Sequence, residues 1–179
     1  MELLFLVDVA NLFHSARSTY GSQARIDFRK LRDAAINGRR FDNILCAAYL
    51  TAKEDSVPDN FCSTLQKLGY TVRLMTSVSH EDGTLSGTNV DVRMALDAVT
   101  GKVGGVFPSH VCIASGDADF MPVYEQLKAR PAVVEVLAFP TSLSAAVEKY
   151  ADRVEKLDET HLFVKRNSHG GRGAKLSLA

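Results

Sequence analysis

The sequence is short of the features that mark several common classes of protein. Its 179 residues include no tryptophan and only three cysteines, Cys46, Cys62 and Cys112, which lack the spacing of a metal site. Cys46 and Cys112 lie inside apolar runs, so we expect buried, reduced thiols and a cytoplasmic location. No run reaches the roughly 20 apolar residues that a membrane span needs, so no membrane partner is expected.

Two further absences concern the ends of the chain. The apolar start, residues 1–13, contains Glu2 and Asp8 and no basic flank, so it is interpreted as a buried strand rather than a signal peptide. The formal net charge is zero, but residues 165–179 hold four of the 21 basic residues and no acid, which leaves 17 basic against 21 acidic residues. The sequence therefore predicts an acidic domain over residues 1–164 and a flexible, basic, glycine-rich tail over 165–179.

Apolar runs alternate with amphipathic segments along the chain. Strands are expected at residues 2–8, 43–51, 70–76, 110–115 and 133–139, and helices at 11–19, 28–37, 58–68, 91–100, 119–130 and 142–151. Residues 77–89 are polar and are predicted to form a loop, while 154–157 and 161–164 are short strands or a docking tail. This alternation is typical of parallel βαβ units, so we predict an α/β fold with a five-stranded parallel sheet flanked by helices.

Acidic residues stand where the predicted strands end. Asp8 closes the first strand, Asp117 and Asp119 follow the fourth, and Asp91 opens the helix before it. The carboxyl ends of the strands in an open α/β sheet share one crevice, so these carboxylates are expected to meet there. Carboxylates gathered in this way repel one another unless a cation lies among them, and Mg²⁺ or Mn²⁺ are the cations that such ligands favour. The pattern indicates metal-assisted phosphate chemistry.

Simpler interpretations remain open for each polar residue. Asp91 and Asp119 could cap helices, and Asn11 could either cap the first helix or hold Asp8 or a phosphate. Ser115 could belong to an ordinary turn or present its hydroxyl to a phosphate. Asp97, six residues after Asp91, is interpreted as a supporting group or as part of a solvated face.

Few basic residues are candidates for contact with a substrate. Arg93 lies close in sequence to Asp91, and Lys53 lies in a predicted loop after the second strand, so either could contact backbone phosphates. Most surface arginines and lysines are simply solvated, so these two assignments are weak ones.

Three segments carry a resemblance to a known family: DVAN at residues 8–11, NVDVRMALD at 89–97 and SGDADFMP at 115–122. Their order and spacing resemble the NYN domain, a PIN-like nuclease fold, and in particular its LabA-like branch, over residues 1 to about 160. The resemblance implies a three-layer sandwich and metal-dependent cleavage of RNA. It also implies that Asp8, Asp91, Asp117 and Asp119 are catalytic and bind metal, and it makes a homodimer an open expectation.

Two positions depart from the pattern usual in that family. Val9 and Ala10 replace a middle pair that often includes an acid, and Thr88 and Asn89 stand where Lys-Gly is common. These departures keep an alternative open, in which the same fold serves as a catalytically weak or inactive module that binds RNA or protein.

Three other enzyme classes are disfavoured by single positions. A haloacid-dehalogenase-type phosphatase needs a second aspartate two residues after the first, where Ala10 stands. A nicotinamide enzyme needs a glycine-rich turn after the first strand, and residues 9–12 contain no glycine. A response-regulator receiver needs an aspartate after the third strand, where Thr76 and Ser77 stand.

Overall fold

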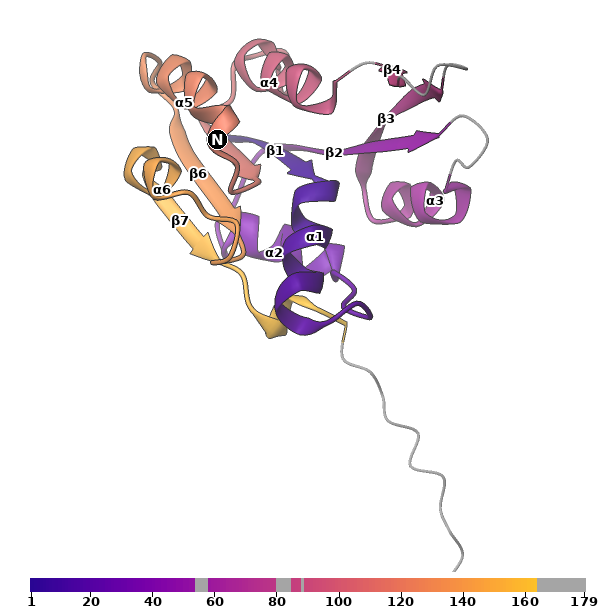
Figure 1. The fold of residues 1–179 in the computed structure, drawn as a ribbon. Coiled ribbons are helices and arrows are strands. Elements are labelled where there is room, and N and C mark those ends of the chain that lie inside the picture. Colours follow the sequence, from indigo (N-terminus) through magenta and orange to yellow (C-terminus); the bar gives the residue numbers. More distant parts are fainter. Residues whose placement is uncertain (54–57, 80–84, 88, 164–179) are drawn as a thin grey trace, which may run out of the picture.

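A seven-stranded sheet forms the centre of the computed structural model, which describes residues 1–53, 58–79, 85–87 and 89–163 (Figure 1). The strand order is β4-β3-β2-β1-β5-β6-β7. The strands are β1 (Glu2–Asp8), β2 (Asn43–Lys53), β3 (Tyr70–Ser79), β4 (Leu85–Gly87), β5 (His110–Ala114), β6 (Val133–Ala138) and β7 (Arg153–Lys156).

The α/β class and the parallel sheet are confirmed, but the predicted number of five strands is wrong. Six strands run parallel, because β7 adds to the outer edge of β6. The seventh, β4, lies in the segment that was predicted to be only a loop, and it pairs antiparallel with the end of β3. A three-residue strand has too few side chains to show a period in sequence, so its pairing partner decides that it is a strand.

Helices cover both faces of the sheet, and two separate cores result. The helices α1 (Val9–Tyr20), α2 (Phe28–Ile36) and α3 (Asp59–Lys67) pack on one face, and α4 (Val90–Thr100), α5 (Met121–Lys128) and α6 (Ala145–Tyr150) pack on the other. Figure 1 shows α4 and α5 above the sheet and α1, α2 and α3 below it. Side chains of β1 alternate between the two cores, since Phe5 belongs to one and Leu6 to the other. This is the predicted three-layer arrangement.

The first strand is central and marks the point at which the chain changes direction across the sheet. The chain moves from β1 outward through β2 and β3, then crosses back and continues through β5 and β6 on the other side. β1 and β5 are parallel neighbours, with Val7 opposite Ala114. The crevice beyond the carboxyl ends of these two strands is therefore the topological switch point, where ligands bind in open α/β sheets.

Several predicted helix ends differ from those observed. Asp27 caps α2 as its position suggests, and Asn37 ends that helix in the left-handed conformation. The helix predicted over 119–130 is split into a short 3-10 turn, η2 (Ala118–Phe120), and α5. The helix predicted over 142–151 begins later, at Ala145, because Ser144 is its N-cap. Near the end of the described chain, the short 3-10 turn η3 (Glu159–His161) is followed by Leu162, which forms an isolated β-bridge with Ile26.

The cysteines agree with the expectation of reduced thiols. All three are free, and Cys46 and Cys112 are buried, whereas Cys62 is half-buried. Burial raises the pKa of the Cys46 thiol to about 11, so it stays protonated at neutral pH. Among the described residues, none of the helices has both the length and the apolar character needed to traverse a bilayer. The predicted tail, 165–179, lies outside the described residues, so the boundary at residue 164 stays a prediction.

Candidate functional site

Asp8 ends β1 at the switch point and is held there by two hydrogen bonds. Its side chain is almost fully buried, with 5% of the residue exposed. Oδ1 accepts a hydrogen bond of 3.0 Å from the backbone N–H of Asn11, which makes Asp8 the N-cap of α1. Oδ2 accepts a hydrogen bond of 3.2 Å from the Ser115 hydroxyl at the end of β5. Asp8 thus has a structural role as a cap, which sequence analysis had not assigned to it.

Ser115 links the ends of the two central strands. It is fully buried, donates to Asp8, and accepts a hydrogen bond of 3.3 Å from the backbone N–H of Asp117. Asp117 in turn caps η2, because its Oδ1 accepts from the backbone N–H of Asp119 at 3.0 Å. Ser115 is therefore more than an ordinary turn residue, and it orients both Asp8 and the segment that carries Asp117.

Asn11 supports the same segment from the other side. Its side-chain oxygen accepts a hydrogen bond of 3.4 Å from the backbone N–H of Gly116, so it neither caps α1 nor contacts Asp8 through its amide. Gly116 has no room for a side chain, because a Cβ atom there would lie 2.3 Å from the backbone oxygen of Ser142. This close packing fixes the turn between Ser115 and Asp117.

Asp91 reaches the site from the first turn of α4. Asn89 is the N-cap of that helix, since its side chain accepts from the backbone N–H of Asp91 at 2.8 Å. The interpretation of Asp91 and Asp119 as caps is therefore wrong, because Asn89 and Asp117 do the capping. The carboxylates of Asp91 and Asp119 remain available for another role.

Repulsion links Asp8 with Asp91 and Asp117, and Asp91 with Asp117 and Asp119. Burial raises the pKa of Asp8 above its ordinary value, and the charges of Asp91 and Asp117 raise it further, against the effect of its hydrogen bonds. Burial also raises the pKa of Asp91, and the charges of Asp117 and Asp119 add to this effect. Each of these two acids is therefore less stable in its charged form than an isolated carboxylate. A cation among them would relieve the repulsion.

This repulsion predicts a dependence of stability on pH that can be tested at Asp8. The pKa of Asp8 is higher in the folded than in the unfolded protein, so folding favours the protonated form and stability decreases as pH rises above about 3.8. Asparagine does not titrate. In buffer without divalent cations, the melting temperature of Asp8→Asn minus that of the wild type should increase between pH 3 and pH 7. Thermal unfolding of both proteins at four or five pH values measures this difference in melting temperature. A difference that does not change with pH would contradict the prediction.

Asp97 belongs to a different group of residues, beside the acids. Its carboxylate accepts a hydrogen bond of 2.8 Å from the Tyr49 hydroxyl and lies 3.2 Å from Nε of Arg93. Nε of Arg73 on β3 lies 3.7 Å away. The interpretation of Asp97 as part of a solvated face is therefore wrong, since only 20% of its side chain is exposed. Lys53 is the last residue of β2, and its side chain lies outside the described part.

The donor set suits a hard divalent cation, although the site is no preformed cage. All the candidate ligands are carboxylate oxygens, and Asp8 is buried, fixed by hydrogen bonds and repelled by its acidic neighbours. Within the described ranges, no three acidic, histidine or cysteine side chains lie close enough to hold one ion together. Mg²⁺ commonly binds through one or two carboxylates and keeps several waters, so this arrangement fits it.

Comparison with known proteins agrees with this fold. The family model described as the NYN domain matches residues 3–158, nearly the whole chain. A solved protein of unknown function from Vibrio parahaemolyticus is 24% identical and superposes with a TM-score of 0.72, over 90% of this chain and 96% of that chain. At this identity the likeness concerns the fold alone. A search of curated proteins gave no match.

Sequence analysis missed two residues beside the site, Tyr49 and Arg73. Both lie in strands that were predicted, but no motif marks them. Only the register shows their place, because Asp8 pairs with Tyr49, and Tyr49 pairs with Arg73 on the next strand.

Proposed function

Because the chain belongs to the NYN domain family, which has a PIN-like nuclease fold, we propose that it is a metal-dependent ribonuclease. The observation that carries the proposal is the buried carboxylate of Asp8 at the switch point, destabilised by the charges of Asp91 and Asp117. A folded protein that keeps such a repulsive group at a ligand-binding crevice has a use for it in binding a cation.

The proposed reaction is hydrolysis of one RNA phosphodiester bond. Asp8 and Asp117 would hold Mg²⁺ or Mn²⁺, and Asp91 and Asp119 would contact it through its water ligands. When bound, the cation supplies charge stabilisation at the phosphate and activation of water at neutral pH. A water oxygen forms a bond to phosphorus, the bond to the 3′-oxygen breaks, and that oxygen takes a proton. The products carry a 5′-phosphate and a 3′-hydroxyl.

The residues around the acids have positioning roles in this proposal. The Asn11 N–H and the Ser115 hydroxyl fix both oxygens of Asp8, so this carboxylate does not have to be ordered when substrate binds. Asn11 holds Gly116, and Ser115 holds the backbone of Asp117, so the acids on β1 and after β5 keep one geometry. Burial of Asp8 excludes bulk water from one side of the site and strengthens electrostatic interactions there.

A panel of labelled substrates tests the function. Single-stranded and hairpin RNA and DNA are incubated with wild type and with Asp8→Asn/Asp117→Asn, in Mg²⁺, in Mn²⁺ or in EDTA. Metal-dependent cleavage of RNA that the double variant lacks would support the proposal, and analysis of the product ends would test the chemistry. Preference for DNA would correct the substrate class.

Metal binding can be tested apart from cleavage. A cation that binds the folded protein at ten times its dissociation constant stabilises it by about 1.4 kcal/mol, which raises the melting temperature of a protein of this size by about 3–6 °C. We expect this shift with Mg²⁺ or Mn²⁺ for the wild type and its loss in Asp8→Asn/Asp117→Asn. Equal shifts in both proteins would place the bound cation elsewhere.

A second candidate, a binding module without catalysis, has support of its own. The described acids do not form a closed ligand set, and Ala10 stands where the family often has an acid. Such a module would bind RNA equally well with and without a chelator and would not cut it. The substrate panel, run beside an RNA-binding assay in EDTA, separates the two functions.

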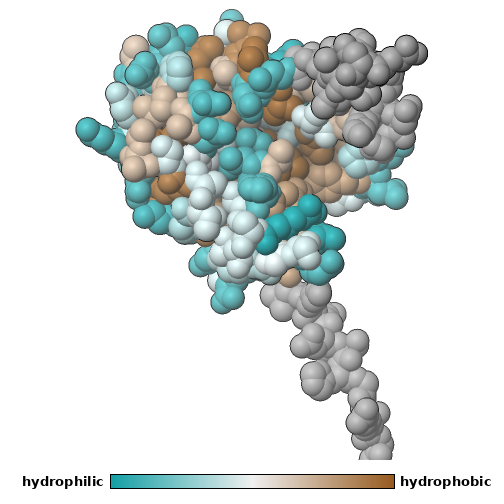
Figure 2. All heavy atoms as spheres, in the orientation of Figure 1, coloured by the Kyte–Doolittle hydropathy of each residue, from teal (hydrophilic) through white to brown (hydrophobic). Residues whose placement is uncertain are grey.

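We also propose that the protein acts in the cytoplasm, which its free cysteines suggest, and as a homodimer, which the family resemblance suggests. Figure 2 shows apolar surface at the top of the view, over α4, where Val92 and Leu96 are 64% and 52% exposed. Sedimentation of the wild type and of Val92→Ser/Leu96→Ser tests whether a dimer forms and whether it uses this surface. The basic segment 165–179, which lies outside the described residues, is proposed to contribute to RNA binding, so its deletion should flatten the salt dependence of that binding.

A further inference from the structure

A row of three residues crosses the sheet from the acidic site to the edge of β3. Asp8, Tyr49 and Arg73 are paired in register on β1, β2 and β3. Tyr49 and Met75 both pack in the core beneath α4, so Arg73, two residues before Met75, lies on the same face. Two strand spacings separate Arg73 from Asp8, about 10 Å between backbones. Arg73 therefore lies on the same face of the sheet as Asp8, two strands away from it.

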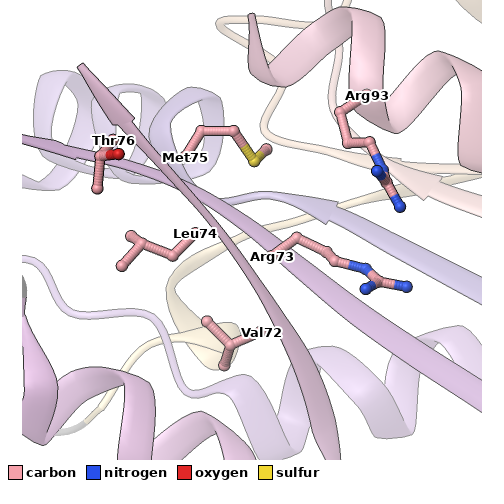
Figure 3. Close-up of a pocket in the computed structure, with 6 residues that line it drawn as sticks. All are labelled: Val72, Arg73, Leu74, Met75, Thr76 and Arg93. Atoms are coloured by element: carbon pink, nitrogen blue, oxygen red, sulfur yellow. The ribbon is translucent and has the colours of Figure 1, made fainter. Parts of the chain in front are cut away.

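Arg93 reaches the same place from α4. Figure 3 shows the guanidinium groups of Arg73 and Arg93 on the same side of β3, one extending from the strand and the other from the helix. Asp97 lies between them, with Nε of Arg93 at 3.2 Å and Nε of Arg73 at 3.7 Å. The hydroxyl of Tyr49 donates to the same carboxylate at 2.8 Å and fixes it in place. Two positive groups thus converge on one partly buried carboxylate.

The charges in this group do not balance. Two guanidinium groups face one carboxylate, which leaves a local excess of one positive charge next to four aspartates. Nε of Arg73 is buried and has no hydrogen-bond acceptor among the described residues. Arg39 and Arg153 form a second arginine pair, which serves as a comparison for an ion pair with a structural role. Both bind the fully buried Glu135 directly, at 2.5 Å. The pair at Asp97 is looser and more exposed, with 41% and 43% of the two side chains accessible.

The two arginines open into a pocket at the edge of the sheet. Its volume is about 430 Å³, and it is lined by Arg93 and by residues 72–76 of β3 (Figure 3). Asp97 lies nearest to the Nε atoms of the two guanidinium groups, and within the described ranges their terminal Nη groups donate to no other protein group. Guanidinium groups that present paired N–H donors match the geometry of a phosphate.

We propose that Arg73 and Arg93 form a clamp for a backbone phosphate of single-stranded RNA, next to the phosphate cleaved at the acids. Asp97 and Tyr49 are its positioning residues. The clamp rests on the proposed function, since RNA is the substrate that would place one phosphate at the acids and another within reach of Arg73. It brings attraction for the substrate into a site whose four carboxylates would otherwise repel it.

The salt dependence of RNA binding tests the clamp. Binding of a single-stranded RNA oligonucleotide is measured at several salt concentrations in EDTA, with Asp8→Asn in every protein so that no RNA is cut. Each phosphate contact on a single strand contributes about −0.7 to the slope of log K against log[salt]. Arg73→Gln/Arg93→Gln should make the slope less negative by about 0.7 and raise Kd on the order of tenfold. Arg40→Gln, an exposed arginine before the amino end of β2, is the matched control.

Two further proteins separate recognition from a structural effect. Arg73→Lys keeps the positive charge but loses the paired N–H donors of the guanidinium group. It should therefore keep the salt dependence of RNA binding and still weaken that binding. Asp97→Asn keeps an acceptor for Tyr49 but loses the charge between the arginines, and it should weaken binding while Arg40→Gln does not. Thermal unfolding of each protein establishes that it is folded.

The outcomes distinguish the clamp from the nuclease. An unchanged slope and Kd in folded Arg73→Gln/Arg93→Gln would overturn the clamp even if the wild type cuts RNA. A changed slope, together with a wild type that cuts no RNA in either metal, would support the clamp and remove the nuclease. An effect seen with a 5′-phosphorylated oligonucleotide and absent with a 5′-hydroxyl one would overturn backbone recognition, because it would indicate a site for terminal phosphate.

Discussion

Replacing Asp8 with asparagine is expected to lower RNA cleavage by about 10²- to 10³-fold, equivalent to about 3–4 kcal/mol of transition-state stabilisation. The carboxylate is the most buried of the four acids and is oriented by the Asn11 N–H and the Ser115 hydroxyl. The asparagine oxygen can still accept from the Asn11 N–H, and its amide N–H can donate to the Ser115 hydroxyl in place of accepting from it, but the negative charge that would hold a divalent cation is lost. The rate of cleavage under single-turnover conditions, in saturating Mg²⁺ or Mn²⁺, measures the loss.

The fold should survive this change. Asparagine caps helices about as well as aspartate, so α1 keeps its N-cap, and the repulsion from Asp91 and Asp117 disappears. Asp33→Asn, at an exposed position on α2, is the matched control and should cleave like the wild type. Cleavage by folded Asp8→Asn within about twofold of the wild type would remove Asp8 from the proposed mechanism.

The largest effect on stability is expected at Glu135, far from the acids. This glutamate on β6 is fully buried, and both of its oxygens bind arginines, Arg39 after α2 and Arg153 on β7. Arg39→Met/Arg153→Met would leave a buried carboxylate without a partner. Such a change costs about 3–5 kcal/mol, or a fall of about 6–20 °C in melting temperature for a protein of this size. Chemical denaturation and thermal unfolding measure the two quantities.

A third substitution separates the lost ion pairs from lost packing. Adding Glu135→Leu to the double variant removes the stranded charge, and buried ion groups replaced by apolar side chains are commonly neutral or more stable. The triple variant should therefore recover most of the lost stability. A triple variant as unstable as the double one would show that the arginines act through packing and their hydrogen bonds to the Ala34 and Ala35 carbonyls. Cleavage should be unaffected wherever the protein is folded.

Sequence alone determined the local features of this protein. The apolar run at residues 2–8 predicts a strand that is buried on both faces. The structure has β1 over the same residues. The alternation of strands and helices predicted the α/β class, and acids at strand ends predicted where a site would lie. The strand and the class were predicted correctly because side chains repeat with a fixed period along a strand or a helix, while the place of the site stays a prediction.

The tertiary structure decided which of these residues meet. Asp8 as a cap, Ser115 as a bridge from β5 to β1, and Asn11 as the support of Gly116 depend on which strands are neighbours. The short strand β4 and the edge strand β7 likewise exist only through their partners.

The register across the sheet is the clearest case. Asp8, Tyr49 and Arg73 are separated by 41 and 24 positions in sequence, and nothing local to any of them specifies the alignment. Strand pairing sets that alignment through hydrogen bonds between backbones and through the packing of α4 over one face. The same is true of the two arginines that enclose Glu135. The sequence by itself determined the longer helices and strands and the positions of the acids along the chain. Only the tertiary structure decided the short strands and which residues are partners, because pairing between distant segments is a property of the assembled sheet.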